Sequence, residues 1–128
     1  MIGVDDFQRL LLALEELREK AKEGWIIVVE GIRDVQALRD LKVEGEIIIF
    51  SGFSDTCDKI RNRKAIILTD SDKKGLEIEK GLVKALSSWG NVPDTTIKRK
   101  IFSATRKEVL RVEELFDFVE RHKNNLKF

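Results

Sequence analysis

Acidic residues follow two short apolar segments of the chain, and their types and spacing are those of a metal site. Residues 25–29 run directly into Glu30, and residues 65–69 run into Asp70 and Asp72. If both segments are neighbouring parallel strands, their carboxyl ends meet at the sheet edge where open α/β folds bind ligands. Mg²⁺ is a hard cation that prefers oxygen ligands and shares them with phosphate groups. The pattern therefore predicts a divalent-metal site suited to phosphate chemistry.

The elements that would position these acids can be predicted from hydrophobic periodicity. Short apolar segments rich in β-branched residues predict buried central strands over residues 25–29, 46–50 and 64–69. Apolar residues at steps of three and four predict helices over residues 5–22, 32–41, 54–62, 73–89 and 107–122. Residues 95–102 alternate imperfectly and predict a fourth strand at a sheet edge. The expected fold is α/β, with a four-stranded, mainly parallel sheet flanked by helices on both faces.

Composition predicts one soluble domain over residues 1–128, which is the usual size of a domain. The single cysteine, Cys57, cannot form an internal disulfide, and neither a signal peptide nor an apolar run of roughly 20 residues is present. We therefore expect a cytoplasmic protein without a membrane partner. Because 24 basic residues face 23 acidic ones, nucleic acid would have to bind to a local basic patch.

Two short motifs contain the acids of the predicted metal site. The first is Val-Val-Glu-Gly at residues 28–31, followed by Asp34. The second is Leu-Thr-Asp-Ser-Asp-Lys-Lys-Gly at residues 68–75. They resemble the first and second motifs of the Toprim superfamily, whose domain is Rossmann-like. Gly31, Asp34 and Gly75 are the supporting residues of these motifs. The resemblance covers residues 24–105 and leaves the first and last predicted helices outside the core, which implies a free-standing small Toprim protein.

The resemblance implies metal-dependent phosphodiester chemistry on nucleic acid. Asp70 and Asp72 would bind Mg²⁺, with Mn²⁺ as the alternative, and Glu30 would be the general acid/base with a share in metal binding. Topoisomerases of this superfamily form their DNA link through a tyrosine, and the chain has none, so it cannot act as one alone. The chain also lacks the cysteine cluster of primases and RecR-type proteins. The nearest class that remains is the Toprim ribonuclease that matures 5S ribosomal RNA.

We therefore expect an RNA-processing nuclease or nucleotidyl-transfer domain, with RNA favoured over DNA as the partner. Two alternatives stay open: a non-catalytic RNA-binding or scaffold module of an RNA-processing complex, and a primase-like subunit that needs a partner chain. Basic residues shortly after predicted strand ends are the candidate contacts to substrate phosphates; they are Arg33, Lys73, Lys74, Arg106 and Lys107. Ordinary solvated charges would account equally well for any one of them.

Simpler interpretations of the acids also remain. Asp70 and Asp72 would suit the N-terminus of the helix that begins near Lys73, where a capping acid contributes about 1 kcal/mol. Glu30 would then be a solvated strand end. Capping, however, requires neither two acids nor a matching Glu on another strand, and close carboxylates repel one another unless a cation is present.

Overall fold

The computed structural model of the protein describes residues 2–124. The three strands of this range are β1 (Ile26–Val29), β2 (Ile47–Ile49) and β3 (Ala65–Ile67). The helices are α1 (Val4–Lys22), α2 (Ile32–Asp40), α3 (Phe53–Ile60), α4 (Lys73–Ser87), α5 (Thr96–Ala104) and α6 (Leu115–Asn124), with a 3₁₀ turn, η1 (Val112–Glu114), before α6. Helices and strands alternate through the first two thirds of the chain, so the fold is α/β.

The sheet is parallel, with strand order β2-β1-β3. β1 is central, and its Val28 pairs with Ile48 of β2 and Ile67 of β3. All four residues of β1 and all three of β3 are buried, as expected for strands covered on both faces. Because β1 and β3 run side by side in the same direction, the residues that follow them emerge together at the carboxyl edge.

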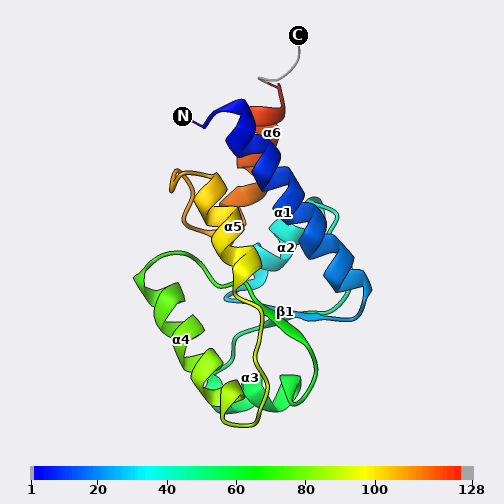
Figure 1. Ribbon diagram of the computed structural model, residues 1–128, viewed down its shortest axis with the longest axis vertical. Coiled ribbons are helices and arrows are strands. Elements are labelled where there is room, and N and C mark those ends of the chain that lie inside the picture. Colours follow the sequence, from blue (N-terminus) through cyan, green and yellow to red (C-terminus); the bar gives the residue numbers. More distant parts are fainter. Residues whose placement is uncertain (1, 125–128) are drawn as a thin grey trace.

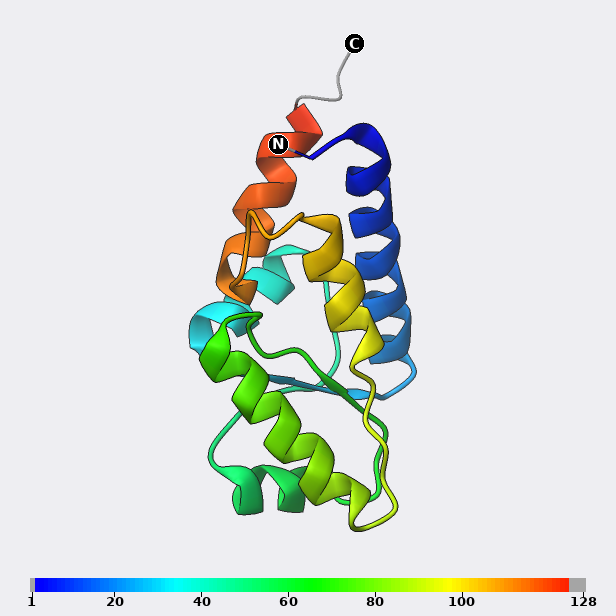
Figure 2. The same ribbon diagram turned by 60° about the vertical axis from the view of Figure 1, so that its left-hand side comes forward.

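Helices form two unequal layers around this sheet (Figures 1 and 2). Ile27 and Val29 face the larger core, to which α1, α2, α5 and α6 contribute. Ile26 and Val28 face the smaller core, formed with α3 and α4. The alternation of side chains along β1 thus divides the apolar residues between the two layers.

The prediction of a four-stranded sheet is wrong, because residues 95–102 form most of helix α5. Residues 97 and 98 are buried, residues 99 and 100 are exposed, and residues 101 and 102 are buried again. Neighbouring residues of a strand point to opposite faces, so burial in adjacent pairs four residues apart fits a helix and not an edge strand. At the sheet edge where the fourth strand was expected, Asp94 lies beside β3. Its backbone exchanges hydrogen bonds with Ala65 and Ile67 of that strand. Its side chain accepts hydrogen bonds from the Ile97 N–H and the Thr96 hydroxyl, so the chain turns into a helix after one bridging residue.

The last helix also begins later than predicted. Residues 107–111 are not helical, and after η1 the α-helix begins at Leu115. The backbone of this segment instead binds the turn after β3: the Ser71 N–H donates to the Leu110 carbonyl at 2.7 Å. That contact with the candidate site uses backbone groups that a helix would have used internally.

Within residues 2–124, no helix is both long and apolar enough to cross a membrane.

Candidate metal centre

Three carboxylates from two strand ends gather at the carboxyl edge of the sheet. One oxygen each from Glu30, Asp70 and Asp72 lies within 4.8 Å of the other two. Glu30 follows β1, and the two aspartates follow β3, its hydrogen-bonded neighbour. Two oxygens on opposite sides of one Mg²⁺ ion are about 4.2 Å apart, because each bond is about 2.1 Å long. Small side-chain rotations would therefore allow all three acids to bind one cation.

Each of the three carboxylates has one oxygen held by a backbone N–H. Glu30 Oε2 accepts from the Asp70 N–H at 2.8 Å, so the two strand ends are joined directly. Asp70 Oδ1 accepts from the Val112 N–H, and Asp72 Oδ1 accepts from the Gly75 N–H, both at 2.8 Å. These bonds fix the orientation of each carboxylate and leave its second oxygen available to a cation, as in metal sites whose ligands are held by surrounding hydrogen bonds.

The turn that carries the two aspartates depends on a glycine. A Cβ atom on Gly75 would lie 2.0 Å from the Asp70 carbonyl oxygen, so only glycine allows the first turn of α4 to approach this closely. The Thr69 hydroxyl donates to the Gly75 carbonyl at 2.7 Å and closes the same turn. Gly75 is therefore explained by close packing of the backbone and not by a contact with a ligand.

Lys98 of α5 supports this turn from behind. Its side chain is only 3% exposed, and its ammonium donates to Thr69 Oγ1 at 2.9 Å and to Glu79 Oε1 at 2.6 Å. This lysine lies within residues 95–102, the segment predicted as an edge strand. Lys98 is buried because α5 is a helix that packs against the end of β3.

Asp34 shapes the other strand end. Its Oδ2 accepts from the backbone N–H groups of Glu30, at 3.2 Å, and Gly31, at 3.0 Å, in the first turn of α2. Gly31 itself has an extended backbone, and a Cβ there would meet nothing within 4 Å. The aspartate of the first motif is therefore structural in this region, whereas its glycine has no steric reason in the fold.

The charged form of Asp70 is disfavoured by burial and by the neighbouring carboxylates. Burial raises the pKa of the Asp70 carboxyl to about 7; the Val112 N–H opposes this rise, and the charges of Asp34, Glu30 and Asp72 add to it. Burial is also the largest cause of the raised pKa of Asp34. A proton or a cation at Asp70 relieves this repulsion, so cation binding and proton release are coupled.

The acids line a cleft of about 280 Å³ that we call the acidic cleft. Its lining consists of Glu30, Asp34, Asp70, Asp72 and Glu113 together with Gly31, Lys74 and Arg111. Sequence analysis missed Arg111 and Glu113. They reach the cleft because the segment before α6 binds the turn after β3, and no sequence pattern signals that long-range contact.

The structure separates the five predicted phosphate contacts. Lys74 lines the acidic cleft, whereas Arg33 lines a different cleft beside Glu113, and Lys73 is exposed at the start of α4. Arg106 and Lys107 line a larger cleft of about 550 Å³ between α4 and α5. We call it the basic cleft, after the four basic residues in its lining: Lys98, Arg99, Arg106 and Lys107. Ser71 lines it too, so the turn that carries Asp70 and Asp72 separates the two clefts.

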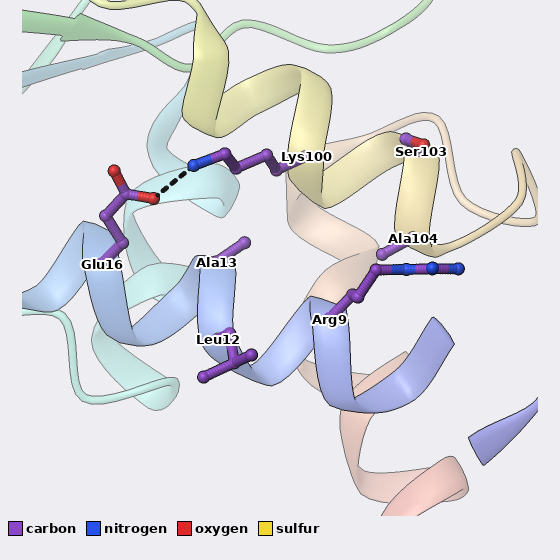
Figure 3. A pocket seen from close by; sticks show the side chains of 7 residues that line it. All are labelled: Arg9, Leu12, Ala13, Glu16, Lys100, Ser103 and Ala104. Carbon is purple, nitrogen blue, oxygen red and sulfur yellow. Dashed lines mark hydrogen bonds and ion pairs between the residues drawn. The ribbon is translucent and has the colours of Figure 1, made fainter. Parts of the chain in front are cut away.

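A further cleft, of about 350 Å³, lies between α1 and α5 (Figure 3). Its only carboxylate is that of Glu16, which pairs with the Lys100 ammonium at 2.9 Å. Leu12 and Ala13 of α1 form part of its wall, and the cleft includes none of the three clustered acids. It is therefore separate from the candidate metal centre.

Together, the fold and site define a parallel α/β protein with a carboxylate cluster where its two central strands end. No protein-family model matches the chain. It is 52% identical over 118 residues to a UPF0292 protein of Archaeoglobus fulgidus, which covers 92% of this chain and 95% of the relative. A UPF0292 protein of Methanocaldococcus jannaschii is 35% identical over 120 residues, with 90% and 93% covered. The chain therefore belongs to the UPF0292 family.

A solved structure of a protein from Aquifex aeolicus has a similar fold. The TM-score is 0.69 at 28% sequence identity, and the alignment covers 82% of this chain and 96% of that one. Over this 82% of the chain, the fold described above is thus shared with a solved structure.

Proposed function

We propose that this protein carries out divalent-metal-dependent phosphodiester chemistry on nucleic acid, as an RNA-processing nuclease or nucleotidyl-transfer domain. The observation that best supports this proposal is that one carboxylate oxygen each of Glu30, Asp70 and Asp72 lies within 4.8 Å of the other two. A backbone N–H also binds one oxygen of each carboxylate. The resemblance of both motifs to Toprim domains is consistent with this proposal. Because the sequence has a single cysteine, we also propose that the protein is located in a reducing cytoplasm.

The donor set fits Mg²⁺ or Mn²⁺. Three carboxylates offer only oxygen ligands, and the cluster includes neither a cysteine nor a histidine that would favour a softer metal. A bound Mg²⁺ would stabilise the charge that develops on a phosphoryl group or activate a water. Because the cleft is partly open, phosphate oxygens and waters would complete the coordination that three protein ligands leave unfilled.

The remaining work falls to side chains of the acidic cleft. Glu30 would hold or release a proton at the reacting oxygen, since its carboxylate is fixed by the Asp70 N–H and faces the cleft. Lys74 and Arg111 are the basic residues of the same lining, and they would orient the phosphate of the substrate. A general base of this kind contributes about 10²- to 10⁴-fold in rate.

Helix capping accounts for only part of the cluster. Asp72 does cap α4, because it accepts the Gly75 N–H. Asp70 instead accepts an N–H from Val112, 42 residues further along the chain, and Glu30 accepts one across the two strand ends. An arrangement that also draws on the amides of Asp70 and Val112 is more than a single helix N-terminus requires.

Cleavage of a structured RNA with both paired and unpaired regions tests the proposal. We expect turnover that requires Mg²⁺ or Mn²⁺ and that falls about 10²- to 10⁴-fold in Glu30→Gln and Asp70→Asn. Glu77→Gln is the matched control: it removes one exposed carboxylate from α4 and should leave the rate within about twofold. Turnover at the wild-type rate in both Glu30→Gln and Asp70→Asn would overturn the assignment of these two residues to the site.

The second candidate function is binding without chemistry, within an RNA-processing complex. The observation that favours it is the basic cleft, whose exposed Arg99 and Lys107 need no metal to bind a polyanion. Salt-sensitive RNA binding without cleavage, in the presence of Mg²⁺, would favour this candidate over the nuclease.

A further inference from the structure

We infer that the basic cleft binds an unpaired nucleotide of the substrate strand, next to the phosphodiester held at the acidic cleft. This inference rests on the proposed function, because it takes the acidic cleft as the place of reaction. It adds the form of the substrate: a single-stranded segment in preference to a duplex.

The first observation is the charge of the two linings. The basic cleft has four basic side chains and one acidic one in its lining. Lys98 pairs with Glu79, and Arg106 pairs with Asp6 of α1 at 3.6 Å, so Arg99 and Lys107 provide most of the net positive charge. The acidic cleft has five acidic and two basic side chains. A phosphodiester strand therefore finds a favourable potential in the basic cleft, and in the acidic cleft only when a cation is present.

The second observation is the shape and the wall of the basic cleft. About 550 Å³ between two helices is in the size range of small-molecule pockets and suits one nucleotide, not a double helix. Leu76 of α4, which is 43% exposed, supplies apolar surface, whereas Phe102 of α5 lines the cleft but is only 4% exposed. Proteins that bind single strands combine such apolar or aromatic surface for the base with basic groups that track the backbone.

The third observation is continuity between the clefts. Ser71 lines the basic cleft, and the residues on either side of it, Asp70 and Asp72, line the acidic cleft. The Ser71 N–H is bound to Leu110, so this wall is fixed in place. A strand whose base lies against Leu76 would therefore pass its neighbouring phosphate directly to the carboxylate cluster.

Arg99 and Lys107 are the residues to change. Both side chains are exposed, on α5 and in the following loop. The double substitution Arg99→Gln and Lys107→Gln removes two charges from the cleft and leaves the buried Lys98 untouched. The matched control is Lys22→Gln with Lys84→Gln: these exposed lysines lie in the last turns of α1 and α4, away from the carboxyl edge, and their loss changes the net charge equally.

The experiment measures fluorescence anisotropy of a labelled RNA of about ten nucleotides, free or annealed to its complement, at varied salt and in EDTA, so that the RNA is not cleaved. We expect the single strand to bind at least about tenfold more tightly than the duplex. The cleft variant should lose about tenfold in single-strand affinity, and its salt dependence should decrease by about 1.4 in the logarithmic slope, for two lost contacts. The control pair should stay within about twofold of wild type. Leu76→Ser should weaken binding several-fold without changing the salt slope.

Equal affinity for single strand and duplex, or an equal loss in the cleft variant and the control pair, would overturn the inference. The outcome for the proposed function is distinct, because binding is measured without cleavage. If Glu30→Gln abolishes turnover while the cleft variant binds RNA like wild type, the metal site stands and the nucleotide site falls. If the cleft variant loses binding as expected while the acidic cluster binds no cation, the nucleotide site stands and the nuclease falls.

Discussion

The acidic and basic clefts are neighbours, separated by the turn of residues 70–72, yet they are built differently. In the acidic cleft, backbone N–H groups hold Glu30, Asp70 and Asp72 in place, and the donors to Glu30 and Asp70 lie 40 and 42 residues away along the chain. Among the basic residues of the basic cleft, Arg99 and Lys107 have long, exposed side chains, whereas Lys98 is buried. The difference teaches that the acids are preorganised for one geometry, which metal coordination requires, whereas the basic rim can adapt to a flexible strand.

This difference also explains which features could be predicted from the sequence. The apolar strands and the acids after them were visible because parallel strands bring their carboxyl ends to a shared edge, so Glu30 and Asp70 meet whatever the helices do. The basic cleft depends on α5, which was predicted as a fourth strand. Arg111 and Glu113 depend on the long-range contact between Val112 and Asp70. Local periodicity contains no information about either arrangement.

The largest expected effect is on the turn that separates the clefts. Gly75→Ala would bring a Cβ within 2.0 Å of the Asp70 carbonyl oxygen, so we expect a loss of about 3 kcal/mol or more in the free energy of unfolding. Gly31→Ala is the matched control, because a Cβ there meets nothing within 4 Å and should cost less than about 1 kcal/mol. Urea denaturation of both variants gives the comparison. Equal stabilities would show that the turn is not closely packed.

The next largest effect concerns the lysine that supports both clefts. Lys98→Ala removes a buried ammonium from Glu79 and Thr69, and we expect a loss of about 3 kcal/mol in unfolding free energy. Lys100→Ala breaks the more exposed pair with Glu16 and should cost less than about 1 kcal/mol. Thermal and urea unfolding measure both. A Lys98 variant as stable as the Lys100 variant would contradict the supporting role.

A smaller expected effect is the pH dependence of stability, which arises in the acidic cleft and not in the basic cleft. Asp70 has a folded-state pKa of about 7 against an ordinary value of 3.8, so the folded state retains a proton that the unfolded state loses. The metal-free protein should therefore lose stability as the pH rises from about 4 to about 8, by about 2 kcal/mol after allowance for solvent screening. Burial raises the pKa of Asp34 in the same direction. Substitutions in the basic cleft should leave this trend unchanged.

Asp70→Asn is the variant that tests the pH effect. It should remove most of the loss in stability between about pH 4 and pH 8, measured by urea denaturation in EDTA. Mg²⁺ should stabilise wild type more at the higher pH, where it no longer competes with a proton. A pH trend that is identical in wild type and Asp70→Asn would show that another group is responsible.

The central claim, that three carboxylates hold one divalent cation, is tested most directly by a crystal structure with Mn²⁺. The account predicts an anomalous scattering peak about 2.2 Å from one oxygen each of Glu30, Asp70 and Asp72. A well-ordered structure with these oxygens spread too far apart to share an ion, or with Mn²⁺ bound elsewhere and not between them, would contradict it.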